Sequence, residues 1–365
     1  MTTQLAAVDG LLARRIQPAE QFFGEEAARI AVLCRALAER FVRGGRLLAV
    51  GGSRQAWSDA HHVAVEFVHP VIVGKRALPA LALHRNELDA VAEADDAVVE
   101  FEPLRFTLGG DEWRFEPPGD DPFVHQELCE TLYHVVWELV HVFFEHLSRS
   151  EAGAGASDFL YPFLRGAAGP LDDVVEDVRR SVLAKSAEVT ALRTQTLEEG
   201  RDELTRAAAR IRGSLDAGGT LLAFGNGGSA TDAADVVADF SAAPQGWPHR
   251  RALDLTSDSA ILTALANDIG PEVLFQRQVI AYAREGDVAL ALSTSGNSAN
   301  IVAALREARR RGLVSVAMVG YDGGRVAADR LADHVVVSRS EHIPRIQEAQ
   351  ASAYHVLREL VEAEP

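Results

Sequence analysis

Two apolar runs that end in glycine, asparagine and serine place the strongest constraint on the fold of this chain. One run, Leu221–Phe224, leads into Gly225-Asn-Gly-Gly-Ser-Ala230, and the other, Val288–Leu292, leads into Ser293-Thr-Ser-Gly-Asn-Ser298. Each run has the length of a strand and is followed by a helical pattern, so each strand delivers its loop to the start of a helix. Glycines let a ligand approach the backbone there, and free N–H groups face an anion. Two such loops in one α/β pattern predict a doubly wound parallel sheet that binds an anion at its strand ends.

The chemistry of the two loops points to a phosphate group on a small molecule. No lysine follows the glycines, as a P-loop would require, and the G-x-G-x-x-G spacing of dinucleotide-binding folds is absent, so we expect no nucleotide cofactor. Hydroxyl and amide groups supply donors without a fixed charge. The loop residues expected to bind the phosphate are Asn226, Gly227, Ser229, Ser293, Thr294, Ser295 and Ser298.

Composition excludes several classes of partner. The chain has 365 residues, enough for two domains, and a net charge of −17, which argues against nucleic acid or an anionic membrane as a partner. The two cysteines, Cys34 and Cys129, lie in apolar helical patterns and are expected to be buried thiols of a reducing compartment. We find no basic-then-apolar leader and no apolar run of membrane-spanning length, so we expect a cytoplasmic protein.

The plan of the chain repeats once. Gly44-Gly-Arg-Leu-Leu-Ala-Val50 matches Gly218-Gly-Thr-Leu-Leu-Ala-Phe224, and a long helical pattern precedes each segment. We therefore predict two related α/β domains, residues 1–150 and 170–365, joined by a linker at residues 151–169. Alternating apolar and polar residues at 98–108, separated by Gly109-Gly-Asp-Glu from Trp113-Arg-Phe, predict a β-hairpin in the first domain.

The repeat can be put in register through polar residues on two of its helices. His62 and Glu66 fall opposite Asp235 and Asp239 at one constant offset, and a second constant offset relates Gln126 and His134 to Gln347 and His355. The second offset is larger, because the second half has additional residues between the two pairs. These accommodate the strand that bears Ser293–Ser298, so the first domain is predicted to be truncated and to lack a second phosphate loop.

The spacing of these polar residues allows two kinds of chemistry. Residues four or eight apart share one face of a helix, as do His62 and Glu66, or Gln126 and His134. If these side chains converge, they would suit zinc or another divalent ion, or proton transfer between adjacent carbons. Pairs of this kind also serve as surface salt bridges or as satisfied polar groups of the core, so spacing alone leaves the alternatives open.

Several of these motifs, in the same order, resemble the SIS (sugar isomerase) domain family and, within it, the phosphoheptose isomerases. The resemblance spans roughly residues 170–363 and is carried by Gly225–Ala230, Asn267-Asp268, Arg284–Val288, Ser293–Ser298 and Arg345–Glu348. It implies a parallel-sheet SIS (flavodoxin-like) fold that binds a phosphorylated sugar, with Asn267, Asp268 and Gln347 as further substrate-binding residues. It also implies a homo-oligomer, which for a tandem chain would be a dimer that mimics a tetramer.

The resemblance assigns roles to the four positions that the repeat aligns. In this family they hold the metal and catalyse the reaction, with the glutamate as base and the last histidine as acid. By position, the implied metal set is His62, Glu66, Gln126, His134, Asp235, Asp239, Gln347 and His355, and the implied catalytic set is Glu66, His134, Asp239 and His355. The first half keeps all four residue types. The second half has aspartates at two positions, and Pro344 stands where the family usually has an acidic residue.

The sequence thus predicts an aldose–ketose isomerase for a sugar phosphate, with sedoheptulose 7-phosphate as the first candidate. Because one half has the phosphate loops and the other the full metal set, we hypothesise a composite site. His62 and Glu66 would face Gln347 and His355, or Asp235 and Asp239 would themselves act. A non-catalytic phosphosugar-binding regulator or scaffold is the alternative, and an isomerase for another sugar phosphate is a third possibility.

Overall fold

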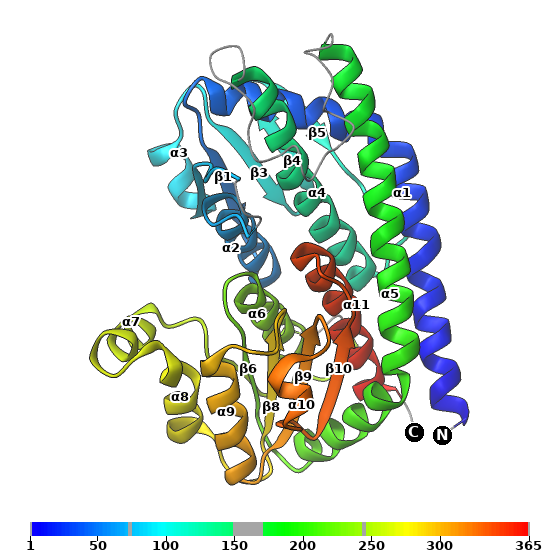
Figure 1. Cartoon of the computed structure of the whole chain (residues 1–365), viewed down its shortest axis with the longest axis vertical. Helices are drawn as coiled ribbons and strands as arrows, with labels where there is room; N and C mark the ends of the chain where they lie inside the picture. Colours follow the sequence, from blue (N-terminus) through cyan, green and yellow to red (C-terminus); the bar gives the residue numbers. More distant parts are fainter. Residues whose placement is uncertain (1, 72–74, 149–170, 243–245, 364–365) are drawn as a thin grey trace. The chain divides into compact units, whose positions relative to one another are not determined.

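The computed structural model describes residues 2–71, 75–148, 171–242 and 246–363, and the chain forms two compact units (Figure 1). The N-terminal unit comprises Gln17–Glu188, and the C-terminal unit comprises Val189–Pro365 together with Met1–Ile16. Two long helices, α1 (Thr2–Val42) and α5 (Leu171–Asp216), contribute to both units. The expected linker, residues 151–169, lies outside the described residues, and the division of the chain at residues 150 and 170 stays a prediction.

The C-terminal unit is built on a five-stranded parallel sheet in the order β10-β9-β8-β6-β7. Its strands are β6 (Leu221–Phe224), β7 (Ala252–Asp254), β8 (Val288–Ser293), β9 (Val314–Gly320) and β10 (His334–Ser338). Every residue of β6, β8 and β9 is buried, as continuous apolar runs require when helices cover both faces. Successive residues of β6 point to opposite faces, so that Leu221 and Leu222 belong to two separate hydrophobic clusters.

Helices flank this sheet, as expected for a doubly wound fold. They are α6 (Gly228–Ser241), α7 (Ser259–Asp268), the 3₁₀ helix η4 (Pro271–Val273), α8 (Leu274–Tyr282), α9 (Ala299–Arg310), α10 (Gly324–Ala328) and α11 (Ile343–Glu362). The core on the α6 and α11 face also includes Val8 and Leu12 from the start of α1. The α/β fold with parallel sheets is thereby confirmed. Within the described residues, no helix combines the length and apolar character needed to span a bilayer.

The N-terminal unit has a mixed sheet in the order β2-β1-β3-β4-β5. Its elements are β1 (Leu47–Gly51), α2 (Arg54–Val68), β2 (Ala80–His84), the 3₁₀ helix η1 (Arg85–Glu87), α3 (Leu88–Val91), β3 (Ala97–Phe101), β4 (Leu104–Leu108), β5 (Asp111–Arg114) and α4 (Pro122–Ser148). Strand β1 pairs in parallel with β2 and β3, whereas β4 pairs antiparallel with β3 and β5. The unit is therefore parallel at one side and ends in an antiparallel meander.

The expected hairpin is present, but its first arm is two strands rather than one. Residues 98–108 break at Glu102 and Pro103, where a turn separates β3 from β4, because proline has no N–H for a sheet ladder. The second turn, at Gly109 and Gly110, joins β4 to β5, and both glycines have positive φ angles. Strand β3 thus closes the parallel part of the sheet and opens the meander.

The repeated Gly-Gly segment ends a long helix in the same way in both units. Gly44 has φ +93° and donates its N–H to the carbonyl of Phe41, and Gly218 has φ +89° and donates to the carbonyl of Leu215. A left-handed residue at this point satisfies the last carbonyls of the helix, and glycine adopts that conformation without steric cost. The chain then turns directly into β1 or β6, which positions the loop at the far end of each strand.

Candidate functional site

The β6–α6 loop of the C-terminal unit has the close backbone packing that its glycines predict. A Cβ atom at Gly225 would lie 2.1 Å from the carbonyl oxygen of Ser229, so only glycine fits there. Gly227 has φ +59° and stands at the N-cap of α6, where a glycine supplies no capping side chain. The start of α6 thus offers backbone groups rather than a side-chain cap, which suits an anion at the positive end of the helix dipole.

The second loop, between β8 and α9, is held in shape by its own hydroxyl groups. The Oγ of Ser293 accepts a hydrogen bond from the N–H of Gly296 at 3.1 Å, and the Oγ of Ser295 accepts one from Asn297 at 3.2 Å. A Cβ at Gly296 would lie 2.3 Å from the carbonyl oxygen of Gly323, so the turn needs glycine. Ser298 is the N-cap of α9 and makes no side-chain capping bond. The hydroxyls of Ser293 and Ser295 can still donate a proton, since both accept in these bonds.

A pair of asparagines ties the two loops together. The side-chain amide of Asn226 donates to Asn300 Oδ1 at 3.0 Å, and the amide of Asn300 donates to Asn226 Oδ1 at 2.8 Å. Strands β6 and β8 are neighbours in the sheet, so their loops lie at the switch point where doubly wound folds bind ligands. The structure therefore brings the predicted phosphate loops together. Asn300 was missed by the sequence reasoning.

Farther along α6, a carboxylate and an imidazole meet in the core. The Oδ2 of Asp239 lies 3.4 Å from Nε2 of His355 on α11, and both side chains are nearly inaccessible to solvent. Asp235 and Gln347 are also buried on these two helices. Carboxylate and imidazole together can move protons between carbon and oxygen atoms of a substrate.

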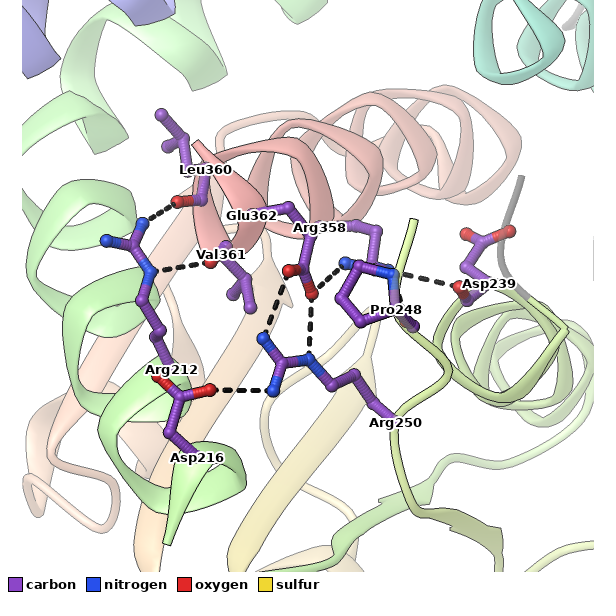
Figure 2. A network of polar contacts seen from close by, with 9 residues as sticks. All are labelled: Arg212, Asp216, Asp239, Pro248, Arg250, Arg358, Leu360, Val361 and Glu362. Carbon is purple, nitrogen blue, oxygen red and sulfur yellow. Dashed lines mark hydrogen bonds and ion pairs between the residues drawn. The ribbon is translucent and has the colours of Figure 1, made fainter. Parts of the chain in front are cut away.

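An arginine network fixes α6 against α11 next to this pair (Figure 2). Arg358 is fully buried, and it donates from Nε to the backbone carbonyl of Asp239 at 3.0 Å and from a terminal nitrogen to Glu362 at 2.6 Å. Arg250 contacts the same carboxylate through two nitrogens, each at 3.0 Å, and reaches Asp216 at 2.7 Å. Because Arg358 lies one turn after His355 on α11, the network holds the end of α6 where Asp239 meets that histidine.

The other predicted residues of this unit lie at different depths. Asn267 and Asp268 end α7, a helix without buried residues, and their exposed side chains bond to each other at 2.7 Å. In the described residues neither side chain is bonded to the two loops. Pro344 occupies the first turn of α11, where a missing N–H costs nothing, so it serves to start the helix. The expected roles of Asn267, Asp268 and Gln347 in substrate binding stay predictions.

The N-terminal unit brings three of its four predicted metal ligands together. Donor atoms of His62, Glu66 and His134 all lie within 4.8 Å of one another, and all three side chains are buried. The Nε2 atoms of the two histidines are 3.2 Å apart, and Glu66 Oε1 lies 4.0 Å from Nε2 of His62. Gln126 lies two turns before His134 on α4, and its amide nitrogen is buried without a hydrogen-bond partner in the described part of the chain.

The donor set of this cluster fits a divalent metal. Burial, together with the neighbouring His134, lowers the pKa of His62 well below its usual value, so this imidazole is neutral. Two imidazoles and a carboxylate are a ligand set of catalytic zinc sites. Among the described residues of the C-terminal unit, no three His, Cys, Asp or Glu side chains converge as closely.

Tyr133 contacts the cluster, Asp59 bonds to Tyr133, and Glu102 acts on Asp59; the sequence reasoning missed all three. The hydroxyl of Tyr133 lies 3.0 Å from Nδ1 of His62 and is hydrogen-bonded to Asp59. Burial raises the pKa of Asp59 to about 8, with Glu102 adding to the effect and the bond from Tyr133 opposing it. The repeat held a signal for two of the three, since Asp232 and Tyr354 take the places of Asp59 and Tyr133 in the second half.

The strand-end loop of the N-terminal unit is closed by a carboxylate. Ser53, the N-cap of α2, accepts a bond from the N–H of Ala56 at 3.1 Å and donates its hydroxyl to Glu102 Oε1 at 2.5 Å. Glu102 directly follows β3, the strand that neighbours β1. A negative charge thus stands beside the only hydroxyl of Gly51-Gly-Ser-Arg54, which disfavours a phosphate there.

Comparison with known proteins agrees with these observations. The model of the SIS domain matches residues 186–320. The phosphoheptose isomerase of Chlorobium phaeobacteroides is 42% identical over 202 residues, which cover 54% of this chain and 88% of that protein. That of Aquifex aeolicus is 39% identical over 52% of this chain and 96% of its own length. These relatives thus match about half of the chain.

One solved structure extends the likeness of fold to nearly the whole chain. The C-terminal domain of glucosamine-fructose-6-phosphate aminotransferase from Francisella tularensis is similar over 94% of this chain and 95% of its own, with a TM-score of 0.54. At 11% sequence identity this likeness concerns the fold alone.

Proposed function

Since this chain belongs to the SIS domain family, we propose that it is a phosphosugar isomerase that interconverts an aldose and a ketose phosphate. The observation that carries the proposal is the pair of loops joined by Asn226 and Asn300, with the buried Asp239–His355 pair on helices of the same unit. The resemblance to phosphoheptose isomerases makes sedoheptulose 7-phosphate the proposed substrate.

The length of helix α6 sets the distance between the loop proposed to bind phosphate and the carboxylates proposed to act on the sugar. It starts at the phosphate loop near Ser229 and carries Asp235 and Asp239 two to three turns later. At 1.5 Å per residue, roughly 9–15 Å separate these carboxylates from the loop. This is the scale of an open-chain sugar phosphate, so a substrate whose phosphate is held at the loops has its other end near the level of the carboxylates.

In the proposed reaction, a carboxylate moves a proton between C1 and C2. Asp239 removes the proton from one carbon, which leaves an enediolate, and returns it to the other carbon. His355 gives a proton to the carbonyl oxygen and takes one from the neighbouring hydroxyl, so that the atoms and charges balance. The hydroxyls of Ser293, Ser295 and Ser298 hold the phosphate and thereby keep the sugar oriented. Glu66 and His134 are the alternative base and acid.

The N-terminal unit is proposed to hold a divalent metal. His62, Glu66 and His134 would bind it, with Gln126 as a further candidate ligand on the same face of α4. When bound, a zinc ion acts as a Lewis acid that stabilises negative charge on an oxygen. The aspartates, glutamine and histidine of the C-terminal unit remain a second candidate set.

A non-catalytic sugar-phosphate-binding role is the second candidate. Asp239 favours it, because aspartate is one methylene shorter than the glutamate that the family uses as base, and Asp235 stands where the first half has a histidine. A base misplaced by about an ångström can lose about a hundredfold in rate. The phosphate loops would then bind a ligand without turnover.

The test is turnover and binding measured on the same preparation. Purified protein is incubated with sedoheptulose 7-phosphate, with and without Zn²⁺, and aldoheptose phosphate is assayed, while calorimetry measures affinity for the sugar phosphate. Formation of the aldose phosphate supports the isomerase. Binding without product under both conditions supports the non-catalytic role, and absence of binding contradicts both.

A further inference from the structure

Beyond the residues that would bind a metal, the N-terminal unit contains a buried chain of polar groups that ends at His62. Asp59 and His62 are three residues apart on α2 and share one helix face. Tyr133 reaches from α4 to both of them, with its hydroxyl hydrogen-bonded to Asp59 and 3.0 Å from Nδ1 of His62. All three side chains are at least nine-tenths buried.

We propose that Tyr133, held by Asp59, is a positioning residue that fixes the tautomer of His62 with its proton on Nδ1. This inference rests on the proposed metal site of the N-terminal unit and names the group that prepares one of its ligands. Neither Tyr133 nor Asp59 is itself a ligand in the proposal.

The positions of the protons distinguish two possible tautomers of His62. A neutral imidazole has one N–H, and each nitrogen of His62 faces a different neighbour. If the Tyr133 hydroxyl donated to Nδ1, the proton of His62 would lie on Nε2, between His134 and Glu66, and would block coordination there. If the hydroxyl donates to Asp59, its oxygen is left to accept from Nδ1, and Nε2 keeps a lone pair for the metal.

The surroundings favour the second arrangement. Asp59 has carboxyl oxygens that accept a hydrogen bond from the hydroxyl of Tyr133, and its Oδ1 has no hydrogen-bond partner among the described residues. A bound dication would also favour the ionised form of Asp59, because positive charge nearby stabilises a carboxylate. Metal-bound histidines commonly donate their second N–H to an oxygen, and loss of that partner typically costs 10- to 100-fold in metal affinity.

The packing of Tyr133 makes a clean variant available. Its ring packs edge-on against Phe101, with centroids 6.3 Å apart, and at a tilt against His62 at 5.2 Å. Tyr133→Phe keeps these ring contacts and removes only the hydroxyl. Tyr354 offers a matched control, because it also precedes a buried histidine, His355, at 4.6 Å between ring centroids. The position equivalent to His62 in that unit is Asp235, which has no ring nitrogen to orient.

The experiment measures the affinity of the full-length protein for Zn²⁺ alone, by competition with a chelating dye. We expect Tyr133→Phe to weaken Zn²⁺ binding about 10- to 100-fold and Tyr354→Phe to leave it unchanged. Both variants should keep the affinity of the wild type for sedoheptulose 7-phosphate. An unchanged Zn²⁺ affinity in Tyr133→Phe, or an equal loss in both variants, would overturn the inference.

A second readout works without metal and separates this inference from the proposed function. The ¹⁵N shifts of His62, assigned by their loss in His62→Gln, report its tautomer in the metal-free protein at about pH 9, where Asp59 is ionised. We expect the Nδ1–H form in the wild type and its loss in Tyr133→Phe. If the wild type binds no Zn²⁺, the proposed metal site fails, and the tautomer still decides the role of Tyr133. An Nε2–H form in the wild type would overturn it.

Discussion

Both units have parallel central strands, of which β1 and β6 lead through a loop into a helix, but they differ in what stands at the ends of these strands. In the C-terminal unit, β6 and β8 end in neutral loops joined by Asn226 and Asn300. In the N-terminal unit, β1 and β3 end at Ser53 and Glu102, which bond to each other. The strand ends of the C-terminal unit offer hydroxyl and amide donors to an anion, whereas those of the N-terminal unit already contain an anionic side chain, Glu102.

The helices that follow these strands also differ, and here it is the N-terminal unit that has the side chains suited to bind an ion. The N-terminal unit gathers two imidazoles and a carboxylate, His62, His134 and Glu66, which suit a cation. In the described part of the C-terminal unit, Asp239 and His355 are in contact at the equivalent positions. The side chains that suit a phosphate and those that suit a cation therefore stand in different units of this chain.

The sharpest test of this comparison replaces the carboxylate by its amide at two equivalent positions, one in each unit. Asp239→Asn removes the proposed base, so we expect kcat for sedoheptulose 7-phosphate to fall about a hundred- to ten-thousand-fold while the affinity for the sugar phosphate is kept. Glu66→Gln, the matched variant of the N-terminal unit, should change the rate less than about tenfold at saturating Zn²⁺. Rapid-quench assays of both variants measure this. A silent Asp239→Asn beside an inactive Glu66→Gln would move the base to the N-terminal unit.

The next test concerns the strand ends. Ser298 makes no capping bond, so Ser298→Ala removes a donor to phosphate without removing a loop contact. A hydrogen bond to a charged group contributes about 1.5–3 kcal/mol, so we expect a 10- to 100-fold loss of affinity for sedoheptulose 7-phosphate in calorimetry. The matched variant, Ser53→Ala, should leave this affinity unchanged, since Glu102 occupies the hydroxyl of Ser53. Equal losses in the two variants would contradict the division between the units.

A smaller effect is expected where the two loops are tied. Asn300→Ala removes both bonds to Asn226, which should lower the free energy of unfolding by about 1 kcal/mol and the sugar-phosphate affinity severalfold. Asn297→Ala serves as the control, because Asn297 is exposed and bonds only with Ser295 and the N–H of Arg325 among the described contacts. Thermal denaturation and calorimetry compare the two. Asn300→Ala with the affinity of the wild type would show that the tie is not needed to shape the site.

The sequence predicts the parts of this arrangement that depend on local pattern. Buried strands such as β6 and β8 are continuous apolar runs, and their loops follow directly, so the parallel sheet and the positions of the two loops proposed to bind phosphate could be predicted. Spacing alone left open whether His62 meets His134, and the hypothesis that they share one site came from the family resemblance, which gives both positions a role in that site.

Contacts between distant segments could not be predicted in the same way. The bond between Ser53 and Glu102 and that between Asn226 and Asn300 depend on which strands are neighbours, and nothing local in the sequence marks Glu102 or Asn300 as the partner. The same holds for Val8 and Leu12, which join the core of the C-terminal unit from the opposite end of the chain. Such contacts follow from the order of strands and helices in space rather than from periodicity.

A last expected difference between the units is a dependence of stability on pH that originates from Asp59. Burial raises the pKa of this carboxyl to about 8, from 3.8 in the unfolded chain. Between these values the folded unit holds a proton that the unfolded chain has lost, so the free energy of unfolding falls as pH rises through the window, by up to roughly 1 kcal/mol per pH unit. Asp59→Asn removes this titration and should flatten the profile.

Tryptophan fluorescence can isolate the N-terminal unit in this measurement. Three of the four tryptophans, Trp57, Trp113 and Trp137, lie there, and Trp247→Phe removes the signal of the C-terminal unit. In that background, urea denaturation between about pH 5 and pH 8 should show a steeper loss of stability with Asp59 than with asparagine. Equal slopes would mean that Asp59 stays ionised when the protein folds, and the buried carboxyl would then have to be stabilised by groups other than Tyr133, because a single neutral donor does not offset the burial of a charge.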